Sequence, residues 1–170
     1  EHMDAFYRPW ADVKGERFDG FMITGAPVET LNFKDVKYWP ELEEIFDWTT
    51  TNVFSMFSIC WGAQAALYHF NGVEKHLINE VPKRFGIFDH HNLEPTHPLM
   101  QGIADVFEIP VSRHTENLRR DVEPIDGLTI LAEHQVSGLG LVAHHNNRLF
   151  YMFNHLVSDR NTLRQEYDPD

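Results

Sequence analysis

The first part of the chain alternates between short apolar runs and helix-like segments, and this alternation restricts the fold more than any other feature. The run Phe21–Thr24 is apolar and partly β-branched and stops at Gly25-Ala26-Pro27, which predicts a buried strand followed by a loop. Helical spacing over residues 41–52, an apolar run over 53–59 and a second helical pattern over 62–70 follow it. Because strands separated by helices need crossover connections, the sequence predicts a parallel sheet with helices on its faces.

The only cysteine, Cys60, stands between the second apolar run and the helix that follows it. A strand-to-helix turn displays its apex residue, as the nucleophile elbows of esterases do, and the positive end of the helix dipole favours a thiolate there. Cys60 is therefore a candidate nucleophile. A buried structural cysteine is an equally good interpretation of this segment taken alone.

Ligands of such sheets bind at the carboxyl ends of the strands. The loop at Gly25 and the cysteine at position 60 both fall at such ends, so we expect them to be neighbours although 35 residues separate them in the sequence.

The second half of the chain is richer in strands. Five more are predicted, over residues 84–88, 106–109, 128–132, 139–143 and 149–153. The last two flank His144-His145-Asn146-Asn147, whose asparagines suit a tight hairpin turn. A terminal helix is predicted over Asp159–Tyr167. The length favours a single domain over residues 1–170.

Composition excludes several kinds of partner. A formal net charge of −12 with 14 lysines and arginines argues against a nucleic-acid or anionic-membrane surface. A single cysteine forbids an internal disulfide, there is no apolar run of about 18 residues, and the first residues do not resemble a secretory leader. We therefore expect a reducing, cytoplasmic location, with no nucleic-acid or membrane partner.

A nucleophilic cysteine needs a base within hydrogen-bond reach. Of the 11 histidines, His155 directly follows an apolar strand and so lies at the same kind of place as Cys60; a surface loop histidine is its alternative. The pairs His90-His91 and His144-His145 suggest a metal, but neighbours on a strand point to opposite faces and no metal motif supports them. We predict no metal site.

Several blocks of sequence, taken in order, resemble the homoserine O-succinyltransferase/O-acetyltransferase family of methionine biosynthesis. The blocks are Thr24-Gly25-Ala26-Pro27-Val28-Glu29, Tyr38-Trp39-Pro40-Glu41-Leu42, Ile45-Phe46-Asp47-Trp48, Ile59-Cys60-Trp61-Gly62-Ala63-Gln64-Ala65-Ala66-Leu67-Tyr68, Phe85-Gly86-Ile87-Phe88 and Ser112-Arg113-His114. The resemblance extends over nearly the whole chain. It implies the fold of class I glutamine amidotransferases, an α/β fold with a doubly wound, mostly parallel sheet, helices on both faces and here a C-terminal hairpin.

The resemblance also implies a ping-pong acyl transfer. Cys60 matches the family nucleophile, which takes an acyl group from acyl-CoA as a thioester, and His155 matches the base that activates the acceptor hydroxyl. Backbone N–H groups of Trp61 and of the Ala26–Val28 segment, Val28 in particular, would form the oxyanion hole. No cofactor is expected to be bound permanently, and acetyl-CoA is the expected co-substrate.

Four further positions match the family's substrate pocket. Lys83, Ser112 and Arg113 match substrate-binding positions, with a solvated lysine and an ordinary strand-end turn as the alternatives. Glu29 matches the position that separates acetyl from succinyl users. A carboxylate there would repel the free carboxylate of a succinyl group, so acetyl is favoured unless Glu29 points to solvent.

The chain departs from the family pattern in three ways. Val157 replaces the glutamate that orients the base, and Pro169 stands near the position of an arginine that grips the acceptor's carboxylate. Family members also carry an N-terminal strand and helix and a C-terminal tail that this chain lacks, so we expect a fragment, a homodimer or a partner chain that completes the sheet.

Three functions are therefore considered. The first is an O-acetyltransferase acting on homoserine or a similar amino acid such as serine, with small-molecule substrates. The second is a glutaminase or other thiol hydrolase, because Cys60-Trp61-Gly62-Ala63-Gln64 fits the broader amidotransferase elbow. The third is a diverged, weakly catalytic binding subunit, which Val157 and Pro169 suggest.

Overall fold

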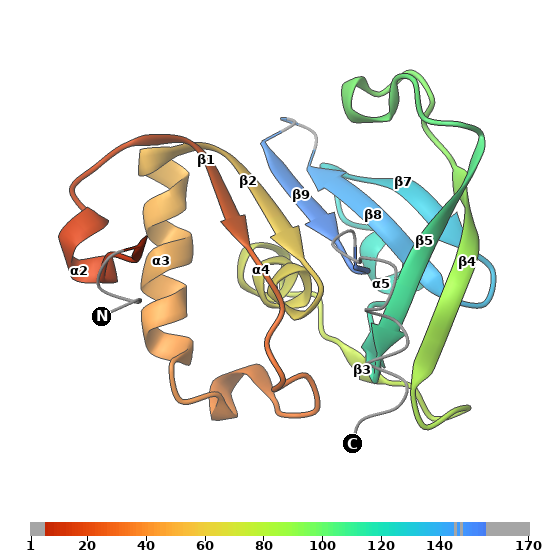
Figure 1. The fold of residues 1–170 in the computed structure, drawn as a ribbon, viewed down its shortest axis with the longest axis horizontal. Coiled ribbons are helices and arrows are strands. Elements are labelled where there is room, and N and C mark those ends of the chain that lie inside the picture. The colour runs from red at the N-terminus through yellow and green to blue at the C-terminus, as the bar shows by residue number, and fades with distance from the viewer. Residues whose placement is uncertain (1–5, 145, 147, 156–170) are drawn as a thin grey trace.

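The computed structural model describes residues 6–144, 146 and 148–155. Its strands and helices follow one another as Figure 1 shows. The strands are β1 (Phe18–Ile23), β2 (Val53–Ile59), β3 (His76–Leu77), β4 (Arg84–Asn92), β5 (Val106–Arg113), β6 (Thr115–Glu116), β7 (Leu128–His134), β8 (Gly138–His144) and β9 (Leu149–Met152). The helices are α2 (Trp10–Val13), η1 (Phe33–Asp35), α3 (Trp39–Asn52), α4 (Trp61–Asn71), η2 (Pro98–Met100) and α5 (Arg119–Val122).

Local signals account for the first helices and strands. Pro40 lies in the first turn of α3, where its missing N–H costs nothing, and α4 ends at Gly72, which adopts the left-handed conformation with φ 69°. The predicted strand over 53–59 and the predicted helices over 41–52 and 62–70 are confirmed. The predicted terminal helix over Asp159–Tyr167 lies outside the described residues.

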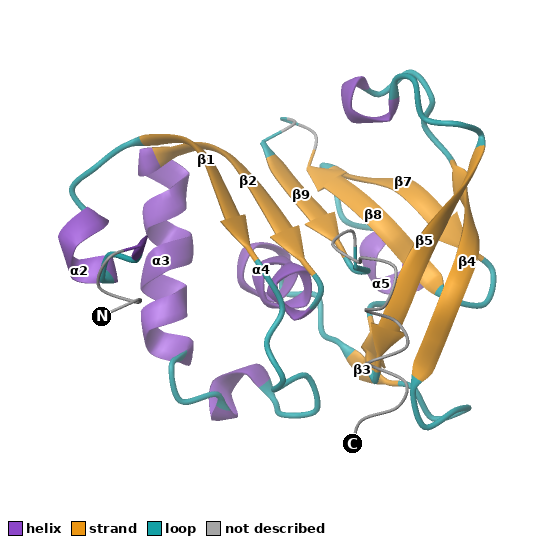
Figure 2. Cartoon of the chain, in the orientation of Figure 1, coloured by secondary structure: helices purple, strands orange, loops and turns teal. Residues whose placement is uncertain are grey.

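Seven strands form one sheet in the order β1-β2-β9-β8-β7-β4-β5 (Figure 2). The α/β class is confirmed, but the expectation of a mostly parallel sheet needs correction: only β1–β2 and β2–β9 are parallel, and the other four pairings are antiparallel. Crossover helices join only the early strands, and a hairpin joins β8 to β9 as predicted. β3 and β6 form a separate antiparallel pair.

Helices α3, α4 and α5 pack on one face of the sheet. Side chains of α3, α4 and α5, among them Phe46, Leu67 and Val122, share one hydrophobic cluster with Met56 and Tyr151 of the sheet. The opposite face forms a second cluster with η2 instead of a longer helix. The described helices therefore cover one face, where helices on both faces were expected. No described helix is long and apolar enough to span a membrane.

The parallel part of the sheet brings three strand ends together. Ile23 of β1 pairs with Ser58 of β2, and Ile59 pairs with Met152 of β9, so all three strands end at the same edge. The sheet curls, with β4 and β5 at its far end (Figure 1). This curl returns Pro110 of β5 to His155, whose N–H donates to the Pro110 carbonyl at 3.2 Å.

Candidate active site

Cys60 is the residue between β2 and α4, and its backbone is strained. With φ 56° and ψ −126° it has the only positive φ among the non-glycine residues that the structure describes. Such a conformation costs about 1–3 kcal/mol and persists only when the surroundings fix it. The Cys60 N–H donates to the Met152 carbonyl at 2.8 Å, which ties the turn to β9. The predicted strand-to-helix elbow is confirmed.

Two glycines let the loop after β1 pack against this elbow. A Cβ on Gly25 would lie 3.0 Å from Cβ and 3.1 Å from Sγ of Cys60, and a Cβ on Gly62 would lie 2.7 Å from the Thr24 carbonyl oxygen. A side chain at Gly62 would collide with the backbone of the loop after β1, and one at Gly25 would press on the Cys60 side chain, so both positions favour glycine. The expected proximity of the Gly25 loop and Cys60 is confirmed.

The structure brings Cys60 and His155 together from positions 95 residues apart. Cys60 Sγ lies 3.5 Å from His155 Nε2, within hydrogen-bond reach for sulfur. His155 follows β9, and its backbone is fixed to β5 through Pro110. A thiol and an imidazole in this geometry can exchange a proton, which is what a cysteine nucleophile and its base require.

A cavity of about 410 Å³ opens beside this pair. The residues that line it come from the loop after β1, the end of β2, β5 and the segments beside them: Thr24, Gly25, Ala26, Pro27, Glu29, Ile59, Cys60, Lys83, Ser112 and His155. Five of the predicted site residues are thus gathered around one space. The Ser112 hydroxyl is buried and has no hydrogen-bond partner among the described residues, so a ligand in the cavity could satisfy it.

Glu29 is held in place by two residues that the sequence reasoning missed. Its Oε2 accepts a hydrogen bond from the His114 N–H at 3.1 Å, while Lys75 Nζ donates to the carbonyl oxygens of Glu29 at 2.5 Å and Leu31 at 2.7 Å. Burial lowers the pKa of Lys75, and the negative charge of Glu29 opposes that shift. A lone lysine and a histidine on a strand end carry no local signal for this role.

Three predicted site residues do not line the cavity. The Trp61 N–H belongs to the first turn of α4, whose N–H groups have no acceptor within the helix. The Trp61 nitrogen faces the loop after β1, since a Cβ built on Gly25 would lie 3.6 Å from it. The Val28 N–H donates to the Ala26 carbonyl at 2.8 Å.

Arg113, the third of these residues, is buried and donates to the carbonyl oxygens of Ser137 and Leu139. Burial lowers its pKa to about 10, and the negative charge of Glu116 opposes that shift.

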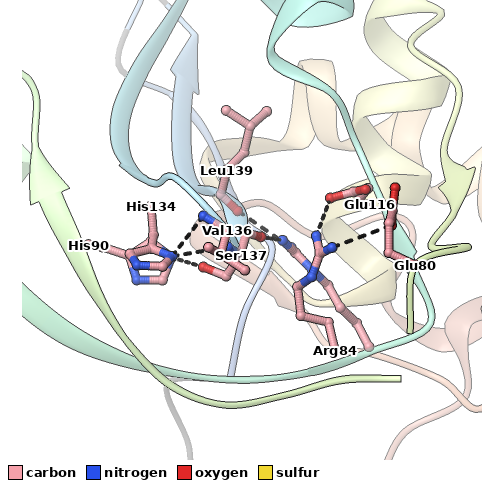
Figure 3. Close-up of polar contacts among 9 residues, drawn as sticks. Glu80, Arg84, His90, Glu116, His134, Val136, Ser137 and Leu139 are labelled. Carbon is pink, nitrogen blue, oxygen red and sulfur yellow. Dashed lines mark hydrogen bonds and ion pairs between the residues drawn. The ribbon is translucent and has the colours of Figure 1, made fainter. Parts of the chain in front are cut away.

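Figure 3 shows the polar surroundings of the turn between β7 and β8. His90 and His134 lie on one side of Ser137, and Arg84 lies on the other, with its Nη1 donating to Glu116 Oε2 at 2.7 Å. Ser137 therefore connects His90 of β4, through its hydroxyl, with Arg113 of β5, through its carbonyl oxygen.

In the described part of the chain the two histidine pairs are represented by His90, His91 and His144. His90 is buried and His91 is exposed, as expected for neighbours on one strand. No group of three or more histidine, cysteine, aspartate or glutamate side chains there could hold an ion.

The fold is that of the glutamine amidotransferases. A glutamine amidotransferase from Thermotoga maritima superposes with a TM-score of 0.64 at 8% identity, covering 87% of this chain and 58% of that one. The glutaminase domain of CTPS from Trypanosoma brucei gives a TM-score of 0.60 at 13% identity, covering 88% of this chain and 68% of that one. At this level of identity the likeness defines the fold alone.

The sequence defines the family. The family description of homoserine O-succinyltransferase matches residues 1–170, so the chain belongs to this family. Curated relatives named homoserine O-acetyltransferase, from Rhizobium leguminosarum bv. trifolii and from Cereibacter sphaeroides, are each 50% identical over 170 residues. The alignment covers all of this chain and 55% of each relative, so the chain spans about half of their length.

Proposed function

We propose that this chain carries the acyl-transfer site of a homoserine O-acetyltransferase. The observation that carries the proposal is the contact of 3.5 Å between Cys60 Sγ and His155 Nε2 at the wall of the cavity. Its support is the family to which the chain belongs and the names of its relatives.

In the first half-reaction Cys60 Sγ, as thiolate, attacks the carbonyl carbon of acetyl-CoA. The carbon–sulfur bond to CoA breaks, and the CoA thiolate takes a proton from the His155 imidazolium. In the second half-reaction the hydroxyl oxygen of homoserine attacks the acetyl-cysteine carbonyl while His155 accepts the hydroxyl proton. The bond to Cys60 then breaks, which returns the thiolate and releases the O-acetyl ester.

The tetrahedral intermediates of both steps need donors for their oxyanion. The Trp61 N–H at the start of α4 suits this role, since the helix dipole adds a positive potential there. The Val28 N–H, which now donates to the Ala26 carbonyl, would join it only after the turn of residues 26–28 opens.

Glu29 would select the acetyl donor. Its carboxylate lines the cavity and is held by His114, so a succinyl group would bring a second negative charge beside it. Lys83 and Ser112, on the cavity wall, would bind the acceptor or donor through charge and hydrogen bonds. Arg113, which is buried, would act through its charge on the thiolate.

The test is incubation of the protein with acetyl-CoA followed by intact mass measurement. We expect a mass gain of one acetyl group, lost in Cys60→Ser, and its release as an O-acetyl ester when homoserine is added. Serine and a blank without acceptor show whether homoserine is the preferred acceptor. An unmodified mass under conditions where iodoacetamide still alkylates Cys60 would contradict the proposal.

A glutaminase is the second candidate, favoured by the fold neighbours and by the elbow Cys60-Trp61-Gly62-Ala63-Gln64, which also fits the broader amidotransferase pattern. Release of ammonia from glutamine, with no acetyl uptake, would support it. A diverged binding subunit is the third candidate; Val157 and Pro169, on which it depends, lie outside the described residues. It would be supported if the protein neither takes up an acetyl group nor releases ammonia from glutamine, and if Val157→Glu restores neither reaction.

We also propose that further polypeptide pairs with β1. This strand is at one edge of the sheet, and its Met22 side chain is 62% exposed on the face opposite the helices. Light scattering after size exclusion distinguishes a homodimer from a monomer. If the protein is a monomer, the polypeptide that pairs with β1 would be an additional segment or a different chain. A cytoplasmic location suits a nucleophile that must remain a reduced thiol.

A further inference from the structure

We propose that His90 is the positioning residue for the base His155 and that it acts through the side chain of Asn154. This inference rests on the proposed pairing of Cys60 with His155. It concerns a histidine on β4 that does not line the cavity.

The segment that carries the base is tied to three different strands. After β9, the Phe153 N–H donates to the Gly140 carbonyl of β8 at 3.0 Å, and the His155 N–H donates to Pro110 of β5 at 3.2 Å. Between them, the Asn154 side chain reaches β4, with its Nδ2 3.2 Å from His90 Nε2. The first two contacts are backbone bonds that any sequence could make, whereas the third depends on two particular side chains.

The hydrogen bonds of His90 define its tautomer. Its Nδ1 lies 2.9 Å from the Phe88 carbonyl oxygen, which can only accept, so Nδ1 carries the proton. In the neutral ring Nε2 is then an acceptor, and both groups that face it, the Ser137 hydroxyl at 3.2 Å and Asn154 Nδ2, can donate. His90 is completely buried, and burial lowers its pKa, which favours this neutral form.

The amide of Asn154 depends on this one acceptor. Asn154 is completely buried, and its Oδ1 has no hydrogen-bond partner among the described residues. The orientation of the residue directly before His155 is therefore set by His90 Nε2. A carboxylate that orients the imidazole is absent from the described part of the cavity wall, apart from Glu29, which His114 already holds.

The His90 ring packs against the backbone of β8 at Gly140. A Cβ on Gly140 would lie 2.6 Å from His90 Cδ2 and 3.2 Å from Nε2, so the ring lies directly against the β8 backbone. This is the residue whose carbonyl accepts from Phe153. A rigid imidazole held at Phe88 and Gly140 is a fixed support for the chain that leads to His155.

The test is the pH dependence of Cys60 alkylation by iodoacetamide, which reports the thiolate and its imidazole without using substrate. The other charged groups that face the sulfur are Glu29 and Lys83 on the cavity wall and Arg113 behind it, and none is altered. In the parent protein we expect the curve of alkylation rate against pH to have a low-pH limb, in which Cys60 still reacts. We expect this low-pH limb to be absent in His155→Ala.

Two variants remove the proposed support. In His90→Leu and in Asn154→Ala we expect the alkylation curve to move toward that of His155→Ala, with a loss of about tenfold in rate at the low-pH limb. His90→Gln keeps an acceptor near the position of Nε2 and should restore the parent curve to within about twofold. Ser137→Ala is the matched control, because it removes the other bond to Nε2 and leaves Asn154 in place.

The inference is overturned if Asn154→Ala keeps the parent curve, or if Ser137→Ala shifts it as far as His90→Leu does. Thermal unfolding is measured for each variant. Should His90→Leu fail to fold, Asn154→Ala and His90→Gln still decide the question. A parent protein that shows the low-pH limb but takes up no acetyl group would contradict the proposed function and leave the positioning role intact.

Discussion

Replacing Gly62 by alanine tests how closely the nucleophile elbow is packed. A Cβ at this position would lie 2.7 Å from the carbonyl oxygen of Thr24 and 3.2 Å from Cγ1 of Ile23, and real Cβ contacts essentially never fall below 3.0 Å. Two effects oppose each other. Alanine favours a helix over glycine by at most about 1 kcal/mol, and an added methyl group in a packed region costs about 1–3 kcal/mol.

Overpacking should prevail, because the nearest atom belongs to the backbone and cannot rotate away. We expect Gly62→Ala to lower the free energy of unfolding by about 1–2 kcal/mol, which for a chain of 170 residues is a fall of about 2–8 °C in Tm. The displaced elbow should also slow alkylation of Cys60 by about tenfold or more.

The assay combines thermal unfolding with iodoacetamide alkylation at one pH. Gly15→Ala is the control, because a Cβ at Gly15 would meet nothing within 4 Å, and its effect should stay within about 0.5 kcal/mol. A Gly62→Ala protein that is as stable as the parent and reacts as fast would refute the close contact between the loop after β1 and the elbow.

Three further predictions concern the core and the buried charges. Phe46→Ala should lower the free energy of unfolding, measured in urea melts, by about 3–5 kcal/mol, because Phe46 is completely buried. Phe54→Ala should lower it by at most about 0.5 kcal/mol, because the Phe54 side chain is 69% exposed. Equal losses in the two variants would contradict the assigned core. Arg113→Met should lower the free energy of unfolding by about 2 kcal/mol, because the two carbonyl groups to which Arg113 donates lose their donor. It should also slow the alkylation of Cys60. Unchanged urea melts would contradict this prediction. Because burial lowers the pKa of His90 below 6.5, the unfolded chain binds a proton there before the folded chain does. Stability should thus fall as the pH drops below 6.5, by at most about 1.4 kcal/mol per pH unit, and the fall should be smaller in His90→Gln; identical slopes would contradict a buried neutral imidazole.

Much of the fold could be predicted because its signals are local. The apolar run at 53–59 and the helix that ends at Gly72 are defined by neighbours in the sequence, and the structure has them within a residue or two. The mixed character of the sheet was missed. The direction of a strand in the second half depends on which strand it pairs with. In the order β7-β4-β5, no short turn in the sequence indicates that β4 pairs with β7 and with β5.

The candidate site divides in the same way. Cys60 and His155 could be proposed because each follows an apolar strand, and their positions at strand ends imply a common edge. The contacts of Glu29 with Lys75 and His114, and of Asn154 with His90, join residues 46, 85 and 64 positions apart. A buried acceptor such as His90 Nε2 has no local pattern, so only the packed structure reveals it.

The two halves of the sheet hold the two members of the pair. The strained turn at Cys60 is fixed by the parallel half, through β2, α4 and the bond to Met152. His155 is fixed by the antiparallel half, through Pro110 on β5 and, by way of Asn154, through His90 on β4. The distance from sulfur to imidazole therefore depends both on the pairing of β2 with β9 and on the bonds that His155 and Asn154 make to β5 and β4. It follows that substitutions of buried β4 and β5 residues that do not line the cavity should change the rate of Cys60 alkylation more than substitutions of equal burial on α3, whose side chains pack in the hydrophobic cluster on the helix-covered face.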